Sequence, residues 1–86
     1  MRPAAIVLIA SALTASPALA EADATASGEE AYREACAECH RSPERLVRGM
    51  RGDESERRER LEAFLIDHHA PDEGMRQSVI AYLLSL

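Results

Sequence analysis

An all-α fold is predicted by three features of the sequence. From residue 27 onward, apolar side chains recur at intervals of three and four residues, which is the spacing of one face of a helix. Residues that commonly cap helices stand directly before these segments. No segment shows the alternation of apolar and polar residues that is typical of a half-buried strand, and no internal repeat is present. The chain is therefore expected to consist of helices and the turns between them.

The first 20 residues have the features of a secretory signal peptide. Arg2 gives a short basic start, an apolar run follows over residues 4–13, and small residues stand at Ala18 and Ala20. We expect export to the periplasm and cleavage after Ala20. The alternative is an uncleaved membrane anchor, but the apolar run is short for a helix that must span a bilayer with about 20 residues. No stable membrane insertion is expected after cleavage.

The first helix is expected to begin at Ser27. Residues 21–26 are small and acidic and show no periodic pattern, so we interpret them as a flexible lead. Ser27 is followed three residues later by Glu30, which is the spacing of a capping box. The apolar side of this helix leads directly into Cys36.

Two further helices are expected in the middle of the chain. Ser42 and Pro43 have the positions of a helix cap and first helical residue, and Gly49 is placed to end this short helix. Asp53, with a glutamate three residues later, repeats the capping-box spacing and predicts a longer helix over residues 54–68. One face of the longer helix carries Leu61, Phe64, Leu65 and His68.

The last helix is expected over residues 73–86. Pro71 ends the preceding helix, and Asp72 is placed to cap the next one. Gly74 weakens the first turn somewhat. An apolar stripe runs through Met75, Val79, Tyr82, Leu83 and Leu86.

Composition limits both the partners and the core. The formal net charge is −5 at pH 7, which argues against nucleic acid as a partner. The chain has two tyrosines, one phenylalanine and no tryptophan, so it can bury little apolar surface. Domains of this size usually gain stability from a disulfide, a metal or a cofactor. We therefore expect a component of the core that the chain itself does not supply.

The sequence Cys36-Ala-Glu-Cys39-His40 contains both cysteines of the chain. A disulfide between them would close a very small loop and add little stability. A thioredoxin-type redox pair needs a βαβ unit, which a small helical domain lacks. A zinc site would need His68 and His69 as well, and adjacent histidines rarely point at one ion. Two thioether bonds to a haem, with His40 as the proximal iron ligand, are the favoured interpretation.

Two segments of the chain resemble those of a known family. The motif G-x3-Y-x3-C-x2-C-H over residues 28–40, together with the final stretch over residues 79–86, is similar to the first and last helices of class I c-type cytochromes. The resemblance implies a small helical domain, residues 27–86, wrapped around one covalently attached haem c per chain. It also implies that the two helices cross at Gly28 and that Tyr32 packs near Tyr82.

The chain departs from the family pattern in two places. The family's proximal-side proline has no clear match, since Pro43 follows His40 too closely. The loop that usually supplies a distal methionine is almost absent between residues 67 and 72. The remaining candidates for the distal ligand are Met50, His68, His69 and Met75.

Helical phase favours His68 as the distal ligand. The mean direction of Leu61, Phe64 and Leu65, which would pack on the haem, lies within roughly 30° of His68, whereas His69 is about 90° away. His68 is therefore the first choice. Ligation by two imidazoles is expected to lower the reduction potential relative to a His/Met cytochrome, because thioether sulfur favours reduced iron.

The expected function is that of a periplasmic single-electron carrier between a redox-protein donor and a redox-protein acceptor. No catalytic residues are assigned, because the sequence offers no distal arginine-histidine pair of the kind that a peroxidase uses. The alternative is a haem-based binding module, in which a labile His68 leaves the iron and a small gas or anion takes its place.

Overall fold

The computed structural model describes residues 3–5 and 17–86. It contains four helices, α1 (Pro17–Ala35), α2 (Pro43–Arg48), α3 (Glu54–Leu65) and α4 (Glu73–Leu84). The described residues contain no strand, so the predicted all-α class is confirmed. None of the helices in this part of the chain is long and apolar enough to cross a bilayer.

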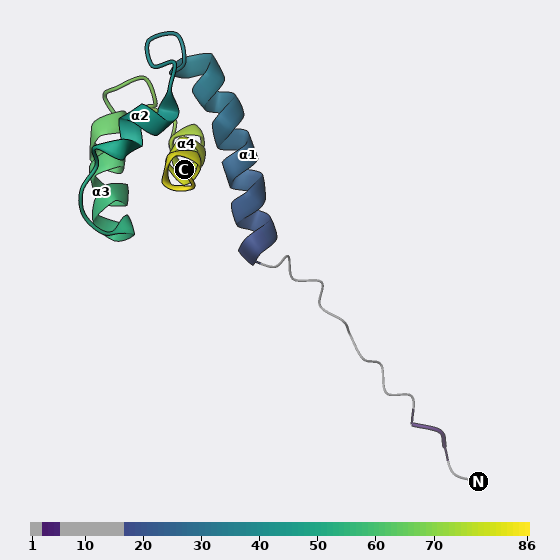
Figure 1. Cartoon of the computed structure of the whole chain (residues 1–86). Coiled ribbons are helices and arrows are strands. Elements are labelled where there is room, and N and C mark those ends of the chain that lie inside the picture. Colours follow the sequence, from purple (N-terminus) through teal and green to yellow (C-terminus); the bar gives the residue numbers. More distant parts are fainter. Residues whose placement is uncertain (1–2, 6–16) are drawn as a thin grey trace.

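Helix α4 lies at the centre of the domain. It contacts each of the other three helices, and Figure 1 shows it between α1 on one side and the α2 and α3 pair on the other. Because three helices pack on it, α4 buries a wide arc that includes Val79, Ile80 and Leu83. The sequence stripe missed Ile80, and Leu86 is exposed at the end of the chain.

Helices α1 and α4 cross at Gly28, as the family resemblance implied. A Cβ atom at Gly28 would lie 1.9 Å from the carbonyl oxygen of Ser78 and 2.8 Å from Cβ of Tyr82, so no larger residue fits without a shift of the backbone. One turn further along α1, the ring of Tyr32 lies 5.7 Å from the ring of Tyr82. Both structural expectations are confirmed.

The start of α1 differs from the prediction. The helix begins at Pro17, so residues 21–26 are helical rather than a flexible lead, and Ser27 lies inside the helix rather than at its cap. Alanine occupies every second position from Ala18 to Ala26, and alanine has the highest helix propensity. Most of the predicted signal peptide, residues 1–2 and 6–16, lies outside the described residues.

The other helix starts agree with the sequence. The carboxylate of Asp53 accepts a hydrogen bond from the Glu56 amide, and the carboxylate of Asp72 accepts one from the Met75 amide, each at 2.8 Å. Pro43 opens α2, and Gly49 ends it.

Helix α3 ends at Leu65, three residues before the predicted end. The chain then forms a turn over residues 66–69, in which His69 has a left-handed backbone with φ of 64°. The amide of Ala70 donates to the carbonyl of Leu65 at 3.2 Å, which is the hydrogen bond of a Schellman motif. This turn places His68 and His69 at the end of α3.

The core is small, as the composition indicated. Its fully or nearly buried apolar residues are Tyr32, Leu61, Leu65, Ala70, Val79, Ile80 and Leu83.

Candidate functional site

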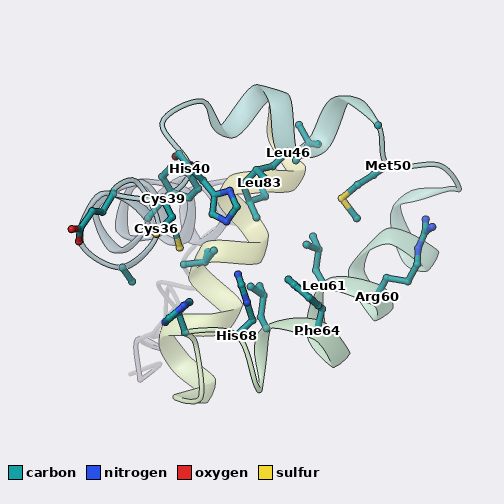
Figure 2. A pocket seen from close by; sticks show the side chains of 18 residues that line it. Cys36, Cys39, His40, Leu46, Met50, Arg60, Leu61, Phe64, His68 and Leu83 are labelled. Carbon is teal, nitrogen blue, oxygen red and sulfur yellow. Dashed lines mark hydrogen bonds between the residues drawn. The ribbon is translucent and has the colours of Figure 1, made fainter.

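A cavity of about 750 Å³ opens between the four helices, beside this small core. Its volume lies within the usual range of cofactor and ligand sites, about 300–1,000 Å³. Figure 2 shows the side chains that surround it. Every helix contributes to the lining, which consists of Tyr32, Ala35, Cys36, Glu38, Cys39, His40, Leu46, Val47, Gly49, Met50, Arg60, Leu61, Phe64, Leu65, His68, His69, Val79 and Leu83.

The cysteine motif continues α1 beyond its last residue. The amide of Cys36 donates to the carbonyl of Tyr32 at 2.8 Å, and the amide of His40 donates to the carbonyl of Cys36 at 2.9 Å. These bonds wind the segment so that Cys36, Cys39 and His40 all line the same cavity. The end of α1 therefore presents two sulfur atoms and one imidazole to one space.

Both cysteines are free thiols in the structure. Cys36 is half-buried and Cys39 is exposed. Burial raises the pKa of the Cys36 thiol, so this thiol is protonated at neutral pH.

Tyr32 is hydrogen-bonded to the backbone of His40. Its hydroxyl donates a hydrogen bond to the carbonyl oxygen of His40. Burial raises the pKa of this hydroxyl, so it remains a donor at neutral pH. Sequence reasoning assigned Tyr32 to packing alone. The hydrogen bond depends on the chain folding back over eight residues, which periodicity does not show.

His68 faces His40 across the cavity. Their ring centres are 6.1 Å apart and the ring planes are tilted by 55°, and Figure 2 shows the two imidazoles pointing toward each other. The ring of Phe64 lies 4.5 Å from that of His68 and braces it from α3. Thus the two histidines come from opposite walls, one after α1 and the other after α3.

This spacing fits two imidazoles on opposite sides of one metal ion. An imidazole nitrogen binds a transition metal at about 2 Å, so two such rings bound on opposite sides have their centres about 6 Å apart. The distance of 6.1 Å between the ring centres of His40 and His68 is compatible with a metal ion between them.

The other three candidates for the distal position differ in their placement. His69 lines the cavity and is exposed, and its ring lies 4.9 Å from that of His68. Met50 also lines the cavity, at the turn before α3. Met75 is half-buried against the core and does not line the cavity. Of the candidate residues, His68 is the one whose ring lies close to that of His40.

The zinc alternative finds no support in this geometry. Within residues 3–5 and 17–86, no group of three or more histidine, cysteine, aspartate or glutamate side chains is arranged to hold a metal ion. Cys36, Cys39 and the two adjacent histidines thus do not converge on one point.

The three residues of α3 that were expected to pack on a haem all line the cavity. Leu61 and Leu65 are buried in the wall formed by α3, and Phe64 stands at the cavity with 59% of its surface exposed. The contributions of α2 and α4 were not predicted. Two features of the sequence could have indicated these walls. Leu46 and Val47 are an apolar pair in the otherwise charged α2, and Val79 and Leu83 lie four residues apart on α4.

Comparisons with protein-family models, with curated proteins and with solved structures found no match to this chain.

Proposed function

We propose that this chain is a small monohaem c-type cytochrome that carries single electrons in the periplasm. Cys36 and Cys39 would hold one haem c by thioether bonds, and His40 and His68 would bind its iron from opposite sides. Export is proposed from the features of residues 1–20.

One observation carries the proposal. His40 and His68 face each other at 6.1 Å across an apolar cavity that both cysteines also line. Two imidazoles that face each other across a cavity, together with two thiols in its lining, match the donor set of a covalently attached haem. A flat apolar group in this space would also add to the small core by covering the exposed side chains of Leu46 and Phe64.

The residues of the chain have distinct tasks in this proposal. When bound, the haem supplies the one-electron chemistry of its iron. Leu61, Leu65 and Val79 keep water from the ring face, and Tyr32 holds the backbone of His40 in place. Cys39 is exposed, so the thioether edge would lie near the surface, where a redox-protein donor or acceptor can approach. Two imidazole ligands favour oxidised iron and so a low potential.

The test is covalent attachment. The full chain, expressed in a host competent in cytochrome maturation, is expected to retain haem after denaturation and extraction, with the mass of one haem added to the chain. The Cys36→Ala/Cys39→Ala double variant should release all of its haem. Met75→Leu is a matched control, because Met75 lies outside the cavity and the change conserves its volume. A folded, colourless wild-type chain from the same host would overturn the proposal.

A haem-based binding module is the second candidate. It is favoured by the position of His68 in the turn over residues 66–69 rather than within α3, since turns open more easily than helix interiors. Carbon monoxide separates the two functions. An electron carrier with His68 firmly bound should bind it slowly and incompletely when reduced, whereas a binding module should bind it readily.

A further inference from the structure

Arg76 is a charged residue buried in the described part of the domain, with 8% of its surface exposed. A buried charge is costly unless it is paired and hydrogen-bonded. The guanidinium meets this condition with three acceptors: Nε donates to a carboxylate oxygen of Glu62 at 2.6 Å, and Nη1 donates to the carbonyls of Ala70 and Pro71 at 3.1 and 3.0 Å. One side chain of α4 thus ties α3 to the segment that follows it.

The acceptors of Arg76 stand on both sides of His68 in the sequence. Glu62 comes before it on α3, and the Ala70 carbonyl comes after it. The same segment is held from within, because the amides of His68 and Ala70 both donate to the carbonyl of Leu65 at 3.2 Å. The turn is therefore held by two hydrogen bonds to the carbonyl of Leu65 within the segment and by hydrogen bonds from Arg76 on α4.

The hydrogen bonds of Arg76 affect the position of His68, the proposed distal ligand. The turn contains His69 in a left-handed conformation, which costs a non-glycine residue free energy and favours opening. If the turn opens, the imidazole of His68 moves away from the position 6.1 Å from His40. Arginine suits the task because its planar fork can donate to a carboxylate and to carbonyls at once, which lysine cannot do as well.

We infer that Arg76 is a positioning residue that keeps His68 at the iron by holding the turn between α3 and α4 closed. This inference rests on the proposed function and names the device that makes the distal imidazole a firm ligand. It also bears on the choice between carrier and binding module, because a closed turn favours the carrier.

The test uses the haem-loaded chain with Arg76→Met, which keeps an unbranched, buried side chain and removes all three hydrogen bonds. Loss of hydrogen bonds from a charged donor should open the turn enough to raise the rate of carbon monoxide binding by the reduced protein about tenfold or more. Arg76→Lys should restore part of the wild-type behaviour. Arg58→Met is the matched control, because Arg58 forms an exposed pair with Glu54 on α3 and should leave the rate unchanged.

Two further measurements keep the test decisive. Amide hydrogen exchange should be faster at His68 and Ala70 in Arg76→Met, with little change at Gly28 in the crossing of α1 and α4. If Arg76→Met does not fold, Glu62→Gln weakens the same clamp more gently and should show the same effects at smaller size. A wild-type chain without haem contradicts the proposed function. A haem-loaded Arg76→Met or Glu62→Gln variant with wild-type carbon monoxide binding and exchange at His68 contradicts this inference alone.

Discussion

Gly28 permits a close backbone contact between α1 and α4. With the Ser78 carbonyl 1.9 Å from the place of a Cβ atom, even alanine would push α1 away from α4. Such a shift would also disturb Tyr32 one turn later, whose hydroxyl holds the His40 backbone. The spacing of the cysteine motif from α4 thus depends on a residue with no side chain.

Gly28→Ala is expected to lower the free energy of unfolding by about 1–3 kcal/mol or more, as overpacking does. Gly74→Ala is the matched control. A Cβ at that position would lie 3.5 Å from a carboxylate oxygen of Asp72, an ordinary contact, and Gly74 lies in α4 outside the cavity, so the effect should be close to zero or slightly stabilising. Urea unfolding of both variants provides the measurement, and equal effects would contradict the proposed helix crossing.

Single residues also mark the limit of sequence reasoning. Helical phase selected His68 over His69, and in the structure the ring of His68 lies 6.1 Å from that of His40, although α3 ends before either histidine. The role of Arg76 had no such signal. Its partners are up to 14 residues away and meet only when α4 folds back on α3.

At the scale of the helices, local rules predicted most starts and missed one. Asp53 and Asp72 cap α3 and α4 because their carboxylates accept backbone amides within the same turn, an interaction that the sequence alone determines. Ser27 has the same spacing to a glutamate, yet it lies inside α1, because the alanine-rich segment before it is also helical. A cap signal therefore predicts a helix start only where the preceding residues disfavour a helix.

The junction of α3 and α4 should respond to acid. The hydrogen bond from Arg76, and to a smaller extent the one from Gln77, holds the pKa of Glu62 below its ordinary value. A carboxylate with a lowered pKa in the folded state adds stability above its ordinary pKa, and that stability is lost as the pH falls through the folded value. The contribution of Glu62 should therefore be present at neutral pH and absent in strong acid.

Urea unfolding of the wild type and of Glu62→Gln across about pH 2–7 measures this contribution. The wild type should be the more stable of the two at neutral pH, and the difference should shrink toward zero in acid. Glu54→Gln is the control, since its pair with Arg58 is exposed and its removal should have little effect at any pH. A difference for Glu62→Gln that is independent of pH would contradict the assignment.

At the scale of the whole molecule, the protein encloses more apolar space than its side chains fill. In the part of the chain that the structure describes, seven apolar residues form the core, and a cavity of about 750 Å³ lies beside them. A domain this small is marginally stable without an added component. A haem in the cavity would become part of the core, and its covalent attachment would keep it there in both oxidation states.

The sequence predicted this architecture from little information. The cysteine motif and the helix spacing are the basis for the proposed cofactor and its two imidazole ligands, while the walls contributed by α2 and α4 became evident only from the fold. Periodicity identifies which face of a helix is apolar, but it does not tell which helix that face will meet.

The most direct test of the central claim is the near-infrared magnetic circular dichroism of the oxidised, purified protein, which distinguishes an iron with two imidazole ligands from one with a thioether ligand. The wild type should show two imidazoles. His69→Gly should show the same spectrum, because glycine suits the left-handed backbone at that position and leaves His68 in place. His68→Ala should lose the signature while keeping its covalent haem. A thioether signature in the wild type, or an unchanged spectrum in His68→Ala, would contradict the account.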